Sequence, residues 1–129
     1  MLVRLTEELK AQALAVAQLY KPLHEPLLVG SCVWLGEGHD IDVVVRVKDA
    51  NKDCGGDQCS SVAYGGMVAY RHNHVNVIAI DDEAIWQGWV YAHRIMPRMP
   101  KELMQHKEFR VKMCEALRAL EEEDQCPSV

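Results

Sequence analysis

Four residues that could bind a metal ion or a phosphate lie close together in the first third of the chain. Gly30 and Ser31 form a pair, and Asp40 and Asp42 follow in a segment rich in β-branched residues. A strand places residues two apart on one face, so both carboxylates are expected to point the same way, with Cα atoms about 6.6 Å apart. Two carboxylates at this spacing can reach one divalent cation, and a Gly-Ser turn offers N–H groups and a hydroxyl to phosphate oxygens. The pattern predicts a site for a metal ion and a nucleotide.

The alternative interpretation of Asp40-x-Asp42 is an exposed strand face that carries acids by chance. The Gly-Ser pair upstream favours a site, because phosphoryl and nucleotidyl transfer depend on positioned charges. Mg²⁺ is typically held by one or two carboxylates together with substrate phosphates and waters. Two aspartates on alternate strand positions meet that requirement.

The elements that must position these residues follow from the periodicity of the chain. Thr6 is predicted to cap a helix that Pro22 ends, and Asp81 or Asp82 to cap a helix to about Met96. Strands are predicted at 27–29, 40–47 and 75–80, a hairpin strand at 62–70 with a turn at 71–74, one or two helical turns at 31–35, and a last helix from about 101 or 106 to 123. This order predicts one α+β domain over residues 1–129, with a small mixed sheet of about three to five strands covered by helices.

Composition limits the classes of function. Of the 129 residues, 49% are hydrophobic, which suffices for a core, and the net charge of −5 argues against general affinity for nucleic acid. The most apolar run, 26–35, is too short to span a membrane, so no membrane partner is expected. An odd number of cysteines, five, and no recognisable signal peptide predict reduced thiols and a cytoplasmic location.

Two segments carry a resemblance to a known family. Val29-Gly30-Ser31 followed by Asp40-Ile41-Asp42-Val43 resembles the signature of the nucleotidyltransferase superfamily, which has the polymerase-β-like fold. A more general likeness, over residues 27–118, is to small phage-encoded nucleotidyltransferase-like proteins. The stretches that carry it are Asp53-Cys54-Gly55-Gly56-Asp57, Tyr70-Arg71, Val75-Asn76-Val77-Ile78, the helix at 84–96 and Lys107-x-x-Arg110.

The resemblance implies a role for each matching residue. Gly30 and Ser31 would hold the β- and γ-phosphates of ATP or another nucleoside triphosphate, and Asp40 and Asp42 would coordinate Mg²⁺. Active members carry a third acid on a neighbouring strand, and the matching position here is Asn76. An amide can contact a metal but cannot act as a base and adds no charge. Asp81 or Asp82, further along the chain, could substitute for it.

Three hypotheses about function follow. The first is an enzyme that transfers a nucleoside monophosphate from ATP or another triphosphate to an unknown acceptor, which could be a protein, a small molecule or RNA. The second is a catalytically degenerate phage protein on the same fold, which acts in the host cytoplasm by binding a host or phage partner. The third is an antitoxin-type minimal nucleotidyltransferase.

Cys54-x4-Cys59 and His72-x-His74 are the alternative metal ligands. Their spacings differ from the Cys-x2–4-Cys and His-x3–5-His of structural zinc sites, so the sequence disfavours zinc. A polar loop with incidental thiols and a turn with histidines is the favoured interpretation.

Basic and aromatic residues are open to two interpretations each. Arg46 and Lys48 share the strand face of the aspartates and could steady them or form salt bridges. Trp86 and Trp89 are predicted to pack in the core rather than to form a stacking platform. Five further basic residues could form a rim for a triphosphate or be ordinary surface charges: Arg71, Arg94, Arg98, Lys107 and Arg110.

Overall fold

A five-stranded mixed sheet forms the centre of the computed structural model, which describes residues 2–50, 61–64 and 67–125. The strand order is β2-β4-β7-β6-β5, in which β4 and β7 are parallel and the other neighbours are antiparallel. The strands are β2 (Leu27–Val29), β4 (Ile41–Arg46), β5 (Ser61–Tyr64), β6 (Met67–His72) and β7 (Val75–Ile80). A separate antiparallel pair joins β1 (Val3–Arg4) to β3 (Glu37–Gly38).

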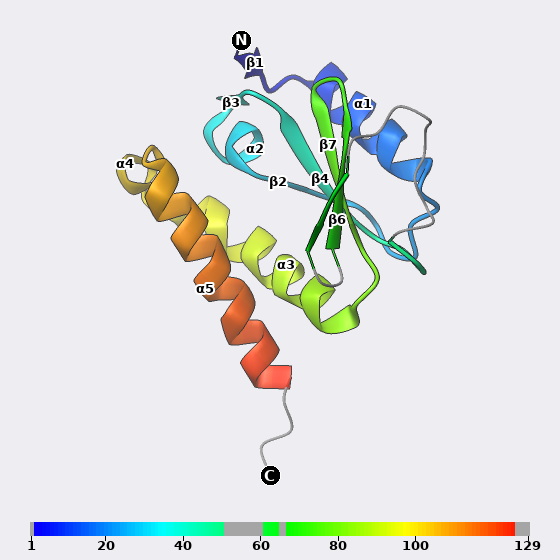
Figure 1. Ribbon diagram of the computed structural model, residues 1–129. Coiled ribbons are helices and arrows are strands. Elements are labelled where there is room, and N and C mark those ends of the chain that lie inside the picture. The colour runs from blue at the N-terminus through cyan, green and yellow to red at the C-terminus, as the bar shows by residue number, and fades with distance from the viewer. Residues whose placement is uncertain (1, 51–60, 65–66, 126–129) are drawn as a thin grey trace.

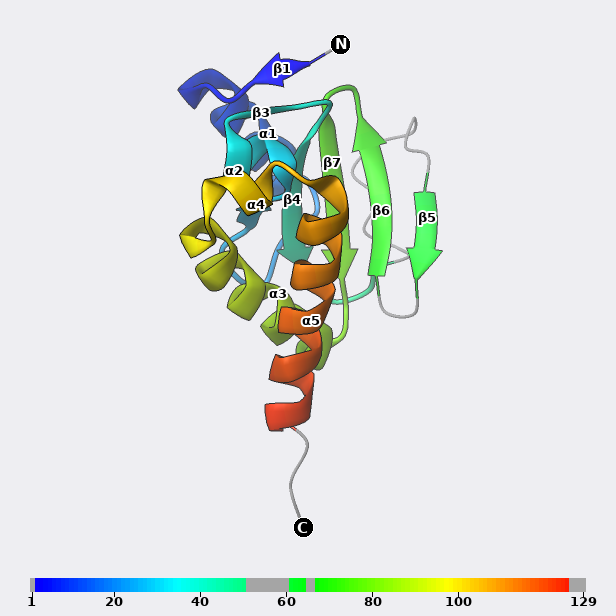
Figure 2. The ribbon, with the colours of Figure 1, turned by 90° about the vertical axis from the view of Figure 1, so that its left-hand side faces the viewer.

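Helices cover both faces of the sheet (Figures 1 and 2). One face packs on α1, and the other faces α3 and α5. The helices are α1 (Glu7–Gln18), α2 (Ser31–Leu35), α3 (Glu83–Ile95), the 3-10 turn η1 (Met96–Arg98), α4 (Lys101–Met104) and α5 (Lys107–Gln125). No helix in the described ranges is long and apolar enough to cross a membrane.

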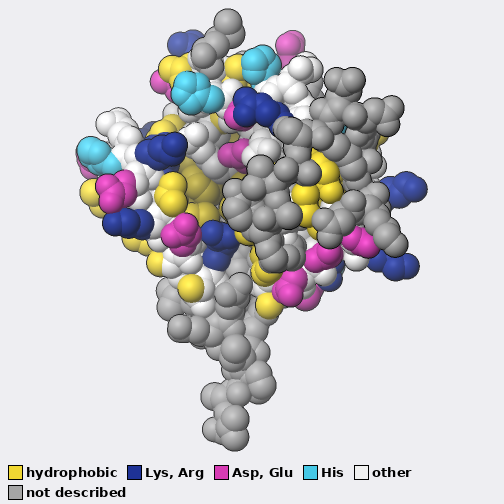
Figure 3. All heavy atoms as spheres, viewed as in Figure 1, with side chains coloured by type: hydrophobic (Ala, Val, Ile, Leu, Met, Phe, Trp, Pro, Cys, Tyr) yellow, Lys and Arg dark blue, Asp and Glu magenta, His cyan; other side chains and the backbone are white. Residues whose placement is uncertain are grey.

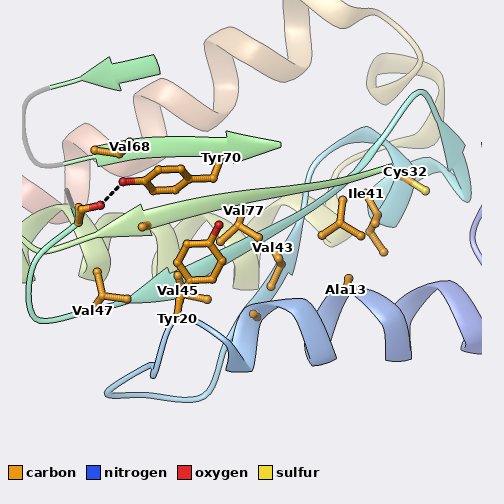
Figure 4. Close-up of a cluster of buried hydrophobic side chains, with 14 residues drawn as sticks. Ala13, Tyr20, Cys32, Ile41, Val43, Val45, Val47, Val68, Tyr70 and Val77 are labelled. Carbon is orange, nitrogen blue, oxygen red and sulfur yellow. Dashed lines mark hydrogen bonds between the residues drawn. The ribbon is translucent and has the colours of Figure 1, made fainter. Parts of the chain in front are cut away.

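The core beneath α1 comes from alternate residues of the central strands. Ile41, Val43 and Val45 of β4 are fully buried against Ala13 and Tyr20 (Figure 4). Because side chains alternate along a strand, the β-branched run of β4 fills this layer and leaves its other positions for the opposite face.

The face toward α3 and α5 changes character along the strands. It begins with Asp42 on β4 and Asn76 on β7, which are neighbours in the sheet. It continues with apolar side chains, among them Val44 and Ile80, which pack with Trp86 of α3. One end of this face is therefore polar, and the polar end adjoins Gly30.

The structure confirms a mixed α+β fold with a small mixed sheet covered by helices. Thr6 caps α1 by accepting a hydrogen bond from the Leu9 N–H at 3.0 Å, and Asp82 caps α3. The helix predicted to run to Pro22 ends earlier, at Gln18, and the chain then turns through Lys21 at a φ of 53°.

Other local details refine the predictions or add to them. The hairpin strand expected at 62–70, with an interruption at Gly65-Gly66, consists of the two strands β5 and β6, and Gly65 and Gly66 themselves lie outside the described residues. The turn predicted at 71–74 is shorter, because β6 continues to His72, which pairs with Val75, and Asn73 takes the left-handed conformation. The β1–β3 pair was not predicted, because two-residue strands are too short to show a period.

Candidate functional site

A single row of residues crosses the sheet at its polar end. Val29 of β2 pairs with Asp42 of β4, Asp42 with Asn76 of β7, and Asn76 with Arg71 of β6. The Asn76 amide donates a hydrogen bond from Nδ2 to Asp42 Oδ1 at 3.1 Å. The sheet therefore brings the predicted metal ligand Asp42 and the position of the expected third acid side by side.

Gly30 follows this row directly and touches the aspartate. Its backbone has φ 91° and ψ −179°, a conformation that is essentially restricted to glycine. A Cβ atom at this position would lie 2.1 Å from Asp42 Oδ2. The Gly-Ser corner and the carboxylate of Asp42 therefore converge, as the sequence pattern predicts.

Ser31 is the first residue of α2, the short helix that begins at this corner. A Cβ atom at Gly38 would lie 3.0 Å from Ser31 Oγ, so the chain passes close to the hydroxyl. The Trp34 N–H donates to the Gly30 carbonyl at 2.9 Å, which closes the first turn of α2. This turn places Ser31 and Trp34 beside Asp42 in the same cavity wall.

Asp40 has a different partner. It lies one residue before β4, and Arg71 donates from Nη2 to its Oδ1 at 2.7 Å. The Arg71 side chain is 57% exposed, so this ion pair contributes little to stability. Asp40 does not line the cavity that Gly30, Ser31 and Asp42 share, although its charge acts on Asp42.

The Asp42 carboxyl titrates unusually. Its pKa is raised from 3.8 to about 6, chiefly by burial and also by the negative charge of Asp40, against the lowering effects of the Asn76 hydrogen bond and of Arg71. A buried carboxylate is costly because it loses hydration. A bound cation would offset this cost.

A cavity of about 260 Å³ separates this corner from α5. Its walls differ in chemistry. The polar end is formed by Gly30, Ser31 and Asp42, the apolar part includes Trp34, Ile78 and Trp89, and the α5 wall carries Lys107, Arg110 and Arg118. Figure 3 shows apolar side chains on the surface beside α5 with basic and acidic side chains around them.

The cations of the α5 wall lack acidic partners. Within the described part of the chain, no carboxylate lies within ion-pair distance of Lys107, Arg110 or Arg118. Arg110 donates from Nη1 to the Met104 carbonyl at 2.6 Å, a neutral acceptor. The α5 wall also carries one carboxylate, that of Glu115, so cations outnumber acids on this wall and favour an anionic ligand.

The structure does not support the possibility that Asp81 or Asp82 substitutes for the third acid. In the parallel pair β4–β7, Asp42 lies beside Asn76, whereas Asp81 and Asp82 follow the far end of β7. Five residues of strand separate Asn76 from Asp81 by about 16 Å. Asp81 accepts a hydrogen bond from the Ala50 N–H at 3.1 Å, and Asp82 accepts one from Ile85, so both stabilise local structure.

The variant Asp82→Ala distinguishes a role of Asp82 in capping α3 from a role in the candidate site. Loss of the helix cap is expected to lower the free energy of unfolding by about 1 kcal/mol, because an N–H of the first turn of α3 loses its partner. Urea unfolding measures this change, and titration with Mg²⁺ and ATP should give the wild-type affinity. A weaker affinity for Mg²⁺ and ATP with unchanged stability would show that Asp82 takes part in ligand binding after all.

Of the two interpretations of Arg46, the structure shows a salt bridge. Arg46 pairs with Glu83 at 2.8 Å and donates to the Val47 carbonyl at 2.5 Å. Arg118 lines the cavity and was not predicted from the sequence. The signal was present: Lys107, Arg110 or Val111, Cys114 and Arg118 recur at helical spacing along one face of α5.

Mg²⁺ fits the donors of this site better than zinc does. Asp42 and Asn76 offer oxygen atoms, which Mg²⁺ prefers, and one or two carboxylates with ligand phosphates suffice for one ion. Among the described residues, no three His, Cys, Asp or Glu side chains are grouped so that they could hold a metal by themselves. Of the alternative zinc ligands, Cys54 and Cys59 lie outside the described residues, and His72 hydrogen-bonds Tyr20.

Comparison with known proteins assigns no family. No family model matches the chain, and no significant match was found to a curated protein or to a solved structure. The likeness to nucleotidyltransferases therefore depends on Gly30, Ser31, Asp40 and Asp42 themselves.

Proposed function

We propose that the protein binds a nucleoside triphosphate with one Mg²⁺ in the cavity between the Gly30–Ser31 corner and α5, and acts as a nucleotidyltransferase. The observation that carries this proposal is the contact of Gly30 with Asp42 Oδ2, where a Cβ atom would lie at 2.1 Å. This contact brings backbone N–H groups that can donate hydrogen bonds to phosphates next to a carboxylate that can coordinate a cation.

Each side chain has a role in this proposal. Asp42 holds Mg²⁺, Asp40 adds negative charge from beside the cavity, and the corner at Gly30 and Ser31 offers N–H and hydroxyl donors to the phosphates. Mg²⁺ would neutralise phosphate charge and orient the leaving pyrophosphate. Lys107 and Arg110 of α5 contact the outer phosphate oxygens. The acceptor would provide the attacking hydroxyl or amine.

Binding without transfer is the second candidate function, and two observations favour it. Asn76 stands where a third acid would act as a base or metal ligand. Arg71 donates a hydrogen bond to Asp40 at 2.7 Å, so this carboxylate already has a cationic partner. A protein of this kind would act by presenting its nucleotide-bound surface to a partner, such as a host or phage protein.

Calorimetry with Mg²⁺ and each of the four ribonucleoside triphosphates tests the site. We expect binding by the wild type and at least a tenfold loss for Asp42→Asn, because the neutral amide cannot balance the cation's charge. Glu102→Gln on α4, a change of the same kind at an exposed position, should bind like the wild type.

Pyrophosphate release, measured with the same triphosphates and a cell extract as the source of acceptor, separates the two functions. Release that depends on Asp42 supports transfer, and tight binding without release supports the second candidate. Failure of all four triphosphates to bind in the presence of Mg²⁺ would refute both.

A further inference from the structure

The sheet face beneath the cavity runs from a polar end to an apolar end. Asp42 and Asn76 lie at the polar end, Ile78 lies two residues further along β7, and Ile80, at the apolar end, pairs with Met67 of β6. Of these residues, Asp42 and Ile78 line the cavity. Four residues of strand separate Asn76 from Ile80 by about 13 Å. In both ribbon views α5 descends in the same direction as β7 (Figures 1 and 2).

The cations of α5 are spread along this direction. Lys107 begins the helix, and Arg118 follows eleven residues later, about 16 Å along the helix axis. Arg118 reaches the Met67 end of the sheet, where its Nη1 lies 3.9 Å from Met67 Sδ. Arg118 therefore lies at the end of the cavity opposite to the one that holds Asp42.

Close helix packing fixes Arg118 in position. Gly88 of α3 lies against the Arg118 backbone, where a Cβ atom would meet the Arg118 carbonyl oxygen at 3.1 Å and its Cβ at 3.2 Å. The guanidinium carbon lies 4.6 Å from the centroid of the Trp89 ring, and the Trp89 indole N–H donates to Met67 Sδ at 3.3 Å. These contacts hold the guanidinium over the indole.

The guanidinium of Arg118, in the cavity wall, does not use all of its hydrogen-bond donors. Its Nε is buried without a hydrogen-bond partner, and no carboxylate in the described ranges pairs with it. Arg118 as a whole is partly exposed and lines the cavity, so one side of its guanidinium remains open to a ligand. A planar guanidinium can stack on an aromatic ring with either face, and Trp89 occupies one of them.

We infer that the base of the nucleotide stacks on the Arg118 guanidinium, at the far end of the cavity from Asp42, with Trp89 supporting the guanidinium from behind. The inference rests on the proposed function, since it assumes that the phosphates lie at the Gly30–Ser31 corner. Bases stack on arginine planes as they do on aromatic rings. Trp89 thus contributes to the site through Arg118 rather than by core packing alone.

Inorganic tripolyphosphate, which has phosphates but no base, tests this inference by calorimetry with Mg²⁺ beside ATP. The wild type should bind ATP at least tenfold more tightly. Arg118→Lys keeps the charge but loses the plane, so it should weaken ATP binding about tenfold and leave tripolyphosphate binding within twofold. Arg94→Lys, on the exposed side of α3, should change neither.

The outcomes distinguish the inference from the function that it extends. Equal affinity of the wild type for ATP and tripolyphosphate, or an equal loss of both in Arg118→Lys, would overturn the stacking role and leave the triphosphate site intact. No binding of either ligand would refute the proposed function, and the stacking role with it. The wild-type comparison decides the question even where a variant folds poorly.

Discussion

Replacing Gly30 with alanine is expected to lower the free energy of unfolding by about 4 kcal/mol and to abolish binding of Mg²⁺ and ATP. Two costs add up. The backbone at φ 91° and ψ −179° is strained for any residue with a Cβ atom, by about 1–3 kcal/mol. The new methyl group would also meet Asp42 Oδ2 at 2.1 Å and push the carboxylate aside, which costs about 1–3 kcal/mol more.

Gly36→Ala is the matched control for this variant. Gly36 also has a positive φ, 90°, but a Cβ atom there meets nothing within 4 Å. Only the left-handed strain remains, so the expected loss is about 1–2 kcal/mol with normal ligand binding. Chemical denaturation and calorimetry measure both variants. Equal losses in the two would show that Gly30 is kept for its backbone alone and not for its contact with Asp42.

The sequence could predict the corner because local patterns encode it. A glycine-serine pair after a short strand and two aspartates at a spacing of two on the next strand need only the alternation of strand residues to be placed. The pairing of β2 with β4 then sets Val29 beside Asp42 and brings Gly30 to the carboxylate. Asn76 is indicated by the resemblance alone, as the residue at the position of the third acid in active nucleotidyltransferases.

The α5 wall could not be predicted in the same way, because it depends on tertiary packing. The sequence leaves Lys107 and Arg110 open as a rim for a triphosphate or as ordinary surface charges, and nothing local shows that α5 lies across the cavity from Gly30. The close approach at Gly88, which sets the position of Arg118, is a contact between two helices. Asp81 and Asp82 are only five and six residues from Asn76 in the sequence. They follow the other end of β7, however, and lie away from Asp42, because β4 and β7 run parallel with Asp42 beside Asn76.

Asp42 carries the last prediction, which concerns pH. Its pKa is raised from 3.8 to about 6 in the folded protein, chiefly by burial. Between these values the native state binds more protons than the unfolded state, so the contribution of this group is fully present below pH 3.8 and is lost as the pH rises through 6. A shift of about two pKa units corresponds to about 3 kcal/mol of stability lost at neutral pH.

Asp42→Asn is neutral at every pH and can keep the hydrogen bond from Asn76. It should therefore match the wild type in stability near pH 4 and exceed it by up to about 3 kcal/mol near pH 8. Other groups, such as Glu83 with its lowered pKa, affect both proteins alike and cancel in the difference.

Added Mg²⁺ should recover part of the stability of the wild type at pH 8 and none in the variant, because only the carboxylate gains a compensating charge. Urea unfolding across this pH range, with and without Mg²⁺, measures all four quantities. A difference between the proteins that does not change with pH would mean that Asp42 is not a costly buried charge. A gain from Mg²⁺ that is equal in both would place the cation elsewhere.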